Sequence, residues 1–176
     1  MEEQDDGQGQ GVFKERGAPM IAIRPARAGE AASLTALCLR SKAHWGYDAE
    51  FMRLCVPSLT VSEQSIAEGR VLVATGDQGQ TIGTVSVTPD GDDAELGLMF
   101  VDPSAIGGGI GRQLFDAAVG LARQLGYRRM TILADVNAAE FYERMGARFL
   151  RDAPSDAIPG RTLPFYEYDL EKELLS

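Results

Sequence analysis

Histidine and cysteine are scarce in this sequence. Its 176 residues include one histidine, His44, and two cysteines, Cys38 and Cys55, which lack a Cys-x-x-Cys spacing. This set disfavours a zinc site and leaves few partners for a Ser-His-Asp triad, so we expect no bound metal. Two separated cysteines are typical of reduced, packed thiols in a cytoplasmic protein.

Long apolar runs and excess positive charge are also missing. No run approaches the roughly 20 apolar residues that cross a bilayer. Residues 1–11 have neither the basic start nor the hydrophobic centre of a signal peptide. The formal net charge of −9 is unfavourable for contact with a phosphate backbone. We therefore expect a cytoplasmic protein whose partners are neither nucleic acid nor membrane.

The chain divides into a tail and one domain. Residues 1–18 form an acidic tail rich in Gly and Gln, and its first part is almost free of apolar side chains. Such a composition predicts disorder. Residues 19–176 are long enough to bury one core, so we expect a single domain there.

Strand and helix patterns are mixed along this domain. The expected strands are 21–24, 70–74, 81–88, 94–101, 129–133, 147–150 and 163–170, and the expected helices are 30–43, 48–55, 62–69, 110–125 and 137–145. Polar turns at 76–79 and 89–92 predict hairpins, whereas the helix 110–125 connects strands that should lie parallel. We read 137–140 as a capping box and 152–161 as a long loop. These patterns predict an α/β (α+β) fold with a mixed, mostly antiparallel sheet of about seven strands and helices on both faces.

A run of glycines follows the fourth expected strand and precedes a helix. The stretch Ile106-Gly107-Gly108-Gly109-Ile110-Gly111 places bare backbone N–H groups at a helix N-terminus, an arrangement that suits a phosphate or pyrophosphate. A mononucleotide P-loop is excluded because no Gly-Lys pair follows. A dinucleotide GxGxxG fingerprint is excluded because its last glycine would fall at Arg112 or Leu114.

The glycine run resembles the loop of the GNAT superfamily of acyl-CoA-dependent N-acyltransferases, (Gln/Arg)-x-x-Gly-x-(Gly/Ala). The resemblance continues through Asn137-Ala138-Ala139 and the run from Phe141 to Ala147, which are similar to the family's Asn-x-x-(x)-Phe-Tyr-x-x-x-Gly element. It covers roughly residues 21–170. In one departure, Ile106 replaces the family's Gln or Arg and removes one side-chain contact to the pyrophosphate, whereas a cradle of backbone N–H groups should survive.

The resemblance implies acetyl-CoA as co-substrate, with no metal. It implies that the backbone of Met99, Phe100 and Val101 pairs with the pantetheine arm. The cofactor-binding residues implied near the pyrophosphate and the arm are Gly107, Gly108, Gly109, Ile110, Gly111, Arg112, Asn137 and Phe141. For Asn137, a contact to the arm and a simple helix cap remain alternatives.

By the same resemblance, Tyr142 is the general acid that protonates the leaving sulfur; the alternative is a tyrosine that only packs in the core. Glu95 is the candidate general base, because it interrupts an apolar strand and period-two alternation places it on one face with Gly97 and Met99. A solvated carboxylate at the strand start is the alternative for Glu95. His44 competes with it as the base.

The resemblance also implies where the acceptor binds. The expected pocket residues are His44, Trp45 and Tyr47 between the first two helices, and Ser155 and Arg161 before the last strand. Arg161 is expected to pair with either a substrate carboxylate or a structural Asp.

The expected reaction is transfer of an acetyl group to a primary amine of a small molecule, by direct attack in a ternary complex. The alternatives are acetylation of a protein N-terminus or lysine, and a non-catalytic acyl-CoA-binding module. A homodimer is also left open.

Overall fold

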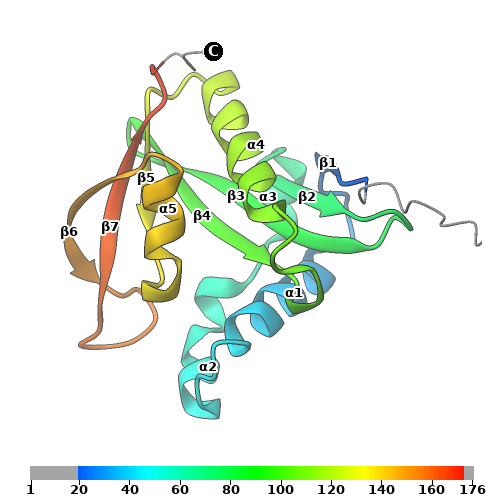
Figure 1. Ribbon diagram of the computed structural model, residues 1–176, viewed down its shortest axis with the longest axis horizontal. Coiled ribbons are helices and arrows are strands. Elements are labelled where there is room, and N and C mark those ends of the chain that lie inside the picture. The colour runs from blue at the N-terminus through cyan, green and yellow to red at the C-terminus, as the bar shows by residue number, and fades with distance from the viewer. Residues whose placement is uncertain (1–19, 173–176) are drawn as a thin grey trace, which may run out of the picture.

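The structure is a computed structural model that describes residues 20–172. The tail expected to be disordered, residues 1–18, lies outside the described residues. Seven strands form one sheet in the order β1-β2-β3-β4-β5-β7-β6 (Figure 1). The strands are β1 (Ala22–Pro25), β2 (Val71–Thr75), β3 (Thr81–Asp90), β4 (Asp93–Val101), β5 (Arg129–Leu133), β6 (Arg148–Pro154) and β7 (Thr162–Asp169).

Helices cover both faces of this sheet, which confirms the expected fold class. The helices are α1 (Ala31–Ala43), α2 (Ala49–Cys55), α3 (Glu63–Ala67), α4 (Ile110–Gln124) and α5 (Ala139–Arg144), with short 3-10 turns η1 (Pro57–Leu59), η2 (Pro103–Ala105) and η3 (Val136–Ala138). One apolar cluster joins the sheet to α4 and α5, and a second joins it to α1, η1 and α3. No helix within residues 20–172 is long and apolar enough to cross a membrane.

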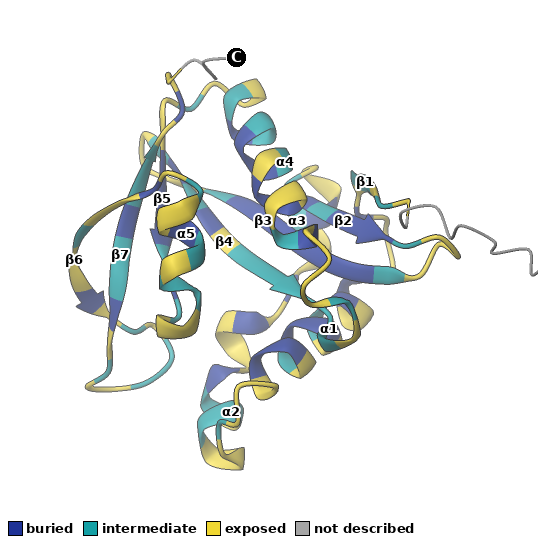
Figure 2. Ribbon diagram, viewed as in Figure 1, coloured by how far each residue is buried: buried dark blue, intermediate teal, exposed yellow. Residues whose placement is uncertain are grey.

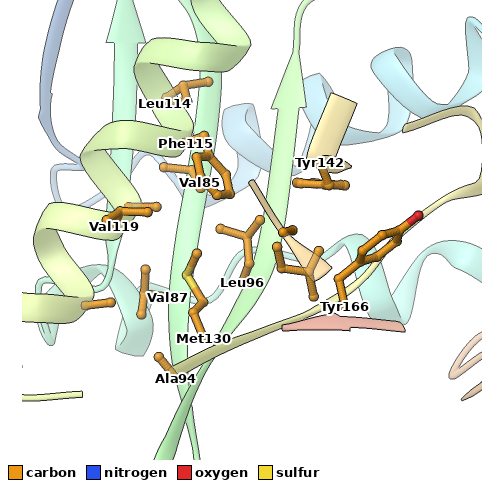
Figure 3. Packing of buried hydrophobic residues seen from close by; sticks show 14 of the residues in the cluster. Val85, Val87, Ala94, Leu96, Leu114, Phe115, Val119, Met130, Tyr142 and Tyr166 are labelled. Carbon is orange, nitrogen blue, oxygen red and sulfur yellow. The ribbon is translucent and has the colours of Figure 1, made fainter. Parts of the chain in front are cut away.

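The larger cluster fixes α4 and α5 against the sheet. Phe115 of α4 is 1% exposed and belongs to this cluster together with Val85 and Leu96 of the sheet (Figure 3). Its ring meets the rings of Phe141 and Tyr168 edge to face, at centroid distances of 6.3 and 5.2 Å. Figure 2 shows the buried residues along the sheet and on the helix sides that face it. The N-terminus of α4 and the residues of α5 are thereby held beside β4.

β4 and β5 pair over a short distance and then diverge (Figure 1). Their parallel register joins Ala94 to Met130 and Glu95 to Thr131, whereas β4 continues to Val101. The backbone of residues 97–101 therefore has no strand partner on the β5 side among the described residues. An open edge of this kind is suited to pairing with an extended ligand.

A β-bulge at Gly97 changes which face the residues of β4 occupy. Leu96 pairs with Val87 and Leu98 pairs with Ser86, so Gly97 is an extra residue in β4. A side chain there would bring its Cβ within 2.9 Å of the Ser86 Oγ, which explains the glycine.

The expectation that Glu95 shares a face with Met99 is wrong, because the bulge reverses the alternation. Met99 packs in the cluster of α4 and α5. Leu98 and Phe100 pack in the α1 cluster, and Glu95 belongs to that α1 face because Leu96, its neighbour, faces α4.

Two local expectations are also corrected. The capping box is wrong: the N-cap of α5 is Ala138, with no side-chain hydrogen bond, and Asp135 instead caps the preceding η3 turn. The loop expected at 152–161 is shorter, because Asp152–Pro154 pair with β7 as part of β6. A proline is tolerated there since β6 is an edge strand.

Candidate active site

A cavity of about 1120 Å³ lies beside the diverging part of β4. It runs from the glycine loop and the start of α4 to the α1–α2 segment and the loop before β7. The predicted site residues that line it are Tyr142, Glu95, Met99, Phe100, Val101, Gly107, Gly109, Ile110, Gly111, Arg112, Asn137, Phe141, Trp45, Ser155 and Arg161. Gly108, His44 and Tyr47 lie outside this lining, and His44 is exposed at the end of α1.

The glycine loop owes its shape to positive φ angles. Gly107 and Gly109 have φ of 90° and 77°, in the left-handed region that favours glycine. Gly109 is the N-cap of the 15-residue helix α4, and no side chain of the described chain caps its first N–H groups. These donors and the helix dipole make this end of the cavity suitable for an anion.

Neighbouring residues of α4, α5 and the loop complete this end of the cavity. A Cβ on Gly111 would lie 3.4 Å from the Phe141 ring, so this glycine allows α5 to approach α4 closely. Ile106 is 51% exposed and apolar, where the family places a polar side chain. The cations that line the cavity here are Arg112 of α4 and Arg144 of α5. The sequence analysis missed Arg144, because only the packing of α5 beside α4 brings it to the cavity.

Tyr142 is both a core residue and a cavity residue. It is 6% exposed and packs against Phe141 and Phe115, with ring centroids 5.2 and 6.2 Å away. Its hydroxyl has no hydrogen-bond partner in residues 20–172. Within residues 20–172, Arg70 Nη1 is the only side-chain nitrogen or oxygen that is both inaccessible to solvent and without a hydrogen-bond partner. The Tyr142 hydroxyl has no partner either, so it must be accessible, and it reaches the cavity that Tyr142 lines. Burial, followed by the negative charge of Asp135, raises the pKa of Tyr142 above its usual value, so the phenol is protonated at neutral pH.

Glu95 is partly buried on the cavity wall. Its carboxylate accepts no side-chain or loop hydrogen bond within the described chain. Burial, then the negative charges of Asp156 and Asp90, raise the pKa of this carboxyl group. A carboxylate with a raised pKa accepts a proton more readily near neutral pH.

Asp135, just after β5, is the centre of a polar cluster that the sequence analysis did not identify. Its Oδ2 accepts hydrogen bonds from Lys42 Nζ and from Tyr47 Oη, the latter at 3.0 Å. Its Oδ1 accepts from the backbone N–H and from Nδ2 of Asn137, both at 2.9 Å. Burial opposes the ionisation of Asp135, but the hydrogen bonds from Lys42 and Asn137 outweigh it and lower its pKa.

The cluster also holds Arg161 and Tyr47. Arg161 Nη2 donates to Tyr47 Oη at 3.1 Å and lies 3.8 Å from Asp135 Oδ2. The Tyr47 ring stacks on Phe51 at 4.0 Å, and Lys42 Nζ lies 5.1 Å from the Tyr47 centroid. One face of Tyr47 is thus covered by Phe51, and both cations lie beside the stacked pair of rings.

Two further predicted site residues, Trp45 and Ser155, also line the cavity. Trp45 is 53% exposed at the cavity wall, and the Ser155 Oγ accepts hydrogen bonds from two backbone N–H groups of its own loop.

One feature of the sequence could have identified Lys42 as a buried charge. It follows Leu34 and Cys38 at a spacing of four, so it takes a position in the apolar stripe of α1.

Comparisons with known proteins agree with this architecture. The family model for the acetyltransferase (GNAT) domain matches residues 67–146. No curated protein sequence gives a significant match. Among solved structures, a GCN5-related N-acetyltransferase from Rhodopseudomonas palustris is 26% identical, with a TM-score of 0.68 over 84% of this chain and 94% of its own.

Two further similar structures contain coenzyme A or acetyl-CoA. PaiA N-acetyltransferase from Thermoplasma acidophilum, in complex with coenzyme A, is 16% identical; its TM-score is 0.69 over 85% of this chain and 99% of its own. YncA from Salmonella typhimurium, with its cofactor acetyl-CoA, is 23% identical; its TM-score is 0.64 over 88% of this chain and 96% of its own. No group of His, Cys, Asp and Glu side chains within residues 20–172 is arranged to hold a metal ion. The family match places a GNAT acetyltransferase domain at residues 67–146, and the diverging strands β4 and β5 with the glycine loop before α4 give the chain the fold of the GNAT N-acetyltransferases.

Proposed function

We propose that the protein transfers the acetyl group of acetyl-CoA to a primary amine of a small molecule, by direct attack in a ternary complex. One observation carries this proposal: a single cavity joins the N-terminus of α4 to Tyr142 and Glu95. A phosphate-binding end, a proton donor and a proton acceptor are what acyl transfer to an amine requires.

The cofactor end offers three kinds of contact. The N–H groups at the start of α4 and the cations Arg112 and Arg144 suit the phosphate groups of acetyl-CoA. The open backbone edge of residues 97–101 suits the pantetheine arm. Ile106 offers no polar side chain to the pyrophosphate, but the backbone N–H groups at the start of α4 do not depend on it.

Acetyl-CoA supplies the thioester that is attacked, and residues of this chain move the protons. Glu95 accepts a proton from the alkylammonium group, whose pKa is ordinarily about 10.4, so that the nitrogen lone pair becomes available. The new C–N bond forms as the C–S bond breaks. Tyr142 then donates its hydroxyl proton to the sulfur that carries the departing charge, and desolvation in the cavity raises the proton affinity of that sulfur. The acylated nitrogen loses its second proton to the resulting Tyr142 phenolate, which yields the neutral amide and restores the phenol, while the first proton leaves through Glu95.

The acceptor side supports a small molecule over a protein chain. Trp45 from the α1–α2 segment and the loop 155–161 contribute to the cavity wall, and bulky side chains there restrict an extended polypeptide. Acetylation of a peptide N-terminus or lysine would require an open groove.

The test is a thiol-release assay with acetyl-CoA and a panel of small primary amines and peptides. We expect turnover with small amines. Higher kcat/KM with peptides would establish the protein acetyltransferase instead. Calorimetric binding of acetyl-CoA without turnover of any acceptor would establish a non-catalytic acyl-CoA-binding module.

A further inference from the structure

We propose that the acceptor amine also carries a carboxylate, and that the Arg161 guanidinium, supported by Lys42, binds this carboxylate in the cavity. The acceptor class is then an amino acid or a similar zwitterion. This inference rests on the proposed function and specifies its substrate.

The charges of the polar cluster do not balance. Lys42 and Arg161 carry two positive charges beside one negative charge, that of Asp135. A carboxylate has about four acceptor positions, and four donors already use those of Asp135: Lys42, Tyr47 and two N–H groups of Asn137. Arg161, at 3.8 Å, is therefore left outside hydrogen-bond distance of Asp135.

The Arg161 guanidinium is held in place yet has free donors. Its centre lies 4.9 Å from the Phe51 ring and 5.4 Å from the Tyr47 ring, and Nη2 donates to Tyr47 Oη. Within residues 20–172, its Nε and Nη1 groups have no hydrogen-bond partner, and neither atom is sealed from solvent. The side chain is 20% exposed and lines the cavity, so these donors are open to a ligand there.

A partly buried cation with unused donors favours a bound anion. Burial weakens the hydration of the guanidinium, and its planar fork of N–H groups matches the two oxygens of a carboxylate. Lys42 Nζ, also on the cavity wall, adds a second positive charge without a second counter-ion.

The same cavity contains negatively charged side chains that suit the ammonium group of such a substrate. Glu95 and Asp156 both line it, and Asp156 is close enough to raise the pKa of Glu95. Glu95 comes from β4 and Arg161 from the loop before β7, so the cavity offers one molecule negative and positive groups from two elements. A zwitterion satisfies both, whereas a simple alkylamine or a polyamine leaves Arg161 unpaired.

The experiment compares matched acceptors. Glycine, β-alanine and larger α-amino acids are assayed with acetyl-CoA beside the amide of each, which keeps the amine and removes the charge. We expect the wild-type kcat/KM to be about 10- to 100-fold higher for the acids, as charge-assisted hydrogen bonds would give.

The R161Q variant should lower kcat/KM for the acids by a similar factor, chiefly through a raised KM, and leave the amides within about threefold. R161K should recover only part of the loss, because an ammonium cannot form the bidentate contact. The matched control is R151Q: Arg151 also stacks on an aromatic ring, with its guanidinium carbon 4.8 Å from the Phe165 centroid, but it is outside the cavity lining.

Equal or better use of the amides by the wild type, or an equal loss on acids and amides in R161Q, would overturn the inference while acetyl transfer itself stands. If no amine is acetylated, the proposed function fails, and calorimetry with the coenzyme A-saturated protein decides the inference separately. Binding of the acids that R161Q abolishes would support it, and an absence of binding would refute it.

Discussion

Lys42 of α1 and Asp135 after β5 form an ion pair that joins the two sides of the active-site cavity. The side chains are 11% and 17% exposed, and 93 positions separate them in the sequence. α1 packs on β4, whereas Asp135 caps the η3 turn that leads from β5 into α5. The pair therefore spans the gap that opens where β4 and β5 diverge.

Removal of the Lys42 charge should destabilise the fold. In K42M, Asp135 keeps its other donors but loses its hydrogen-bonded counter-ion in a largely buried setting, with Arg161 remaining 3.8 Å away, so we expect the free energy of unfolding to fall by about 2 kcal/mol. Urea denaturation measures this. The control is R53M, which breaks the exposed Arg53–Glu50 pair and should leave the free energy of unfolding almost unchanged. An equal change in unfolding free energy in the two variants would show that the buried pair contributes no more to stability than the exposed pair.

Replacement of Tyr142 by Phe should reduce kcat by about 100-fold with little change in KM. The ring and its packing remain, and the proton donor at the leaving sulfur is lost. Steady-state kinetics with any accepted amine tests this. Y166F is the matched control, because the Tyr166 hydroxyl donates to Glu143 at 2.9 Å and Tyr166 is outside the cavity lining. An unchanged kcat in Y142F would remove Tyr142 from the mechanism.

Glu95 should determine the acidic limb of the pH profile. A general base acts when deprotonated, and burial raises the pKa of Glu95, so kcat/KM should fall as the pH drops through a value above the usual Glu range. E95Q should lower kcat/KM by about 100-fold and abolish this limb. The control D92N, at an exposed turn residue, should keep the wild-type profile. Retention of the acidic limb in E95Q would assign it to another group.

Two glycine-to-alanine changes should have effects of opposite sign. G97A forces a Cβ to within 2.9 Å of the Ser86 Oγ at the bulge, so we expect a loss of about 1–3 kcal/mol in unfolding free energy. G120A adds a methyl group within α4 where nothing lies within 4 Å, so helix propensity should raise stability by about 0.5–1 kcal/mol. Thermal or urea unfolding of both variants checks the signs. Stabilisation by G97A would mean that the bulge tolerates a side chain.

The sequence by itself determined the elements whose causes are local. The turn signals at 76–79 and 89–92 mark the hairpins of β2, β3 and β4, although Pro89 and Asp90 still pair as part of β3. Gly107 and Gly109 before α4 adopt the positive φ that glycine allows. The strand, glycine loop and helix that we propose hold the cofactor are adjacent in sequence, so their pattern could be recognised without a structure.

Only the tertiary structure decided how distant side chains meet. The face of Glu95 depends on a bulge that Ser86 on the neighbouring strand accommodates, and period-two alternation contains no information about it. Likewise, the charged groups of Lys42, Asp135 and Arg161 come from three different parts of the chain. They lie together because the sheet brings those parts together. Local propensity extends over a few residues, whereas the register of strands and the packing of helices set the positions of charges far apart in the chain.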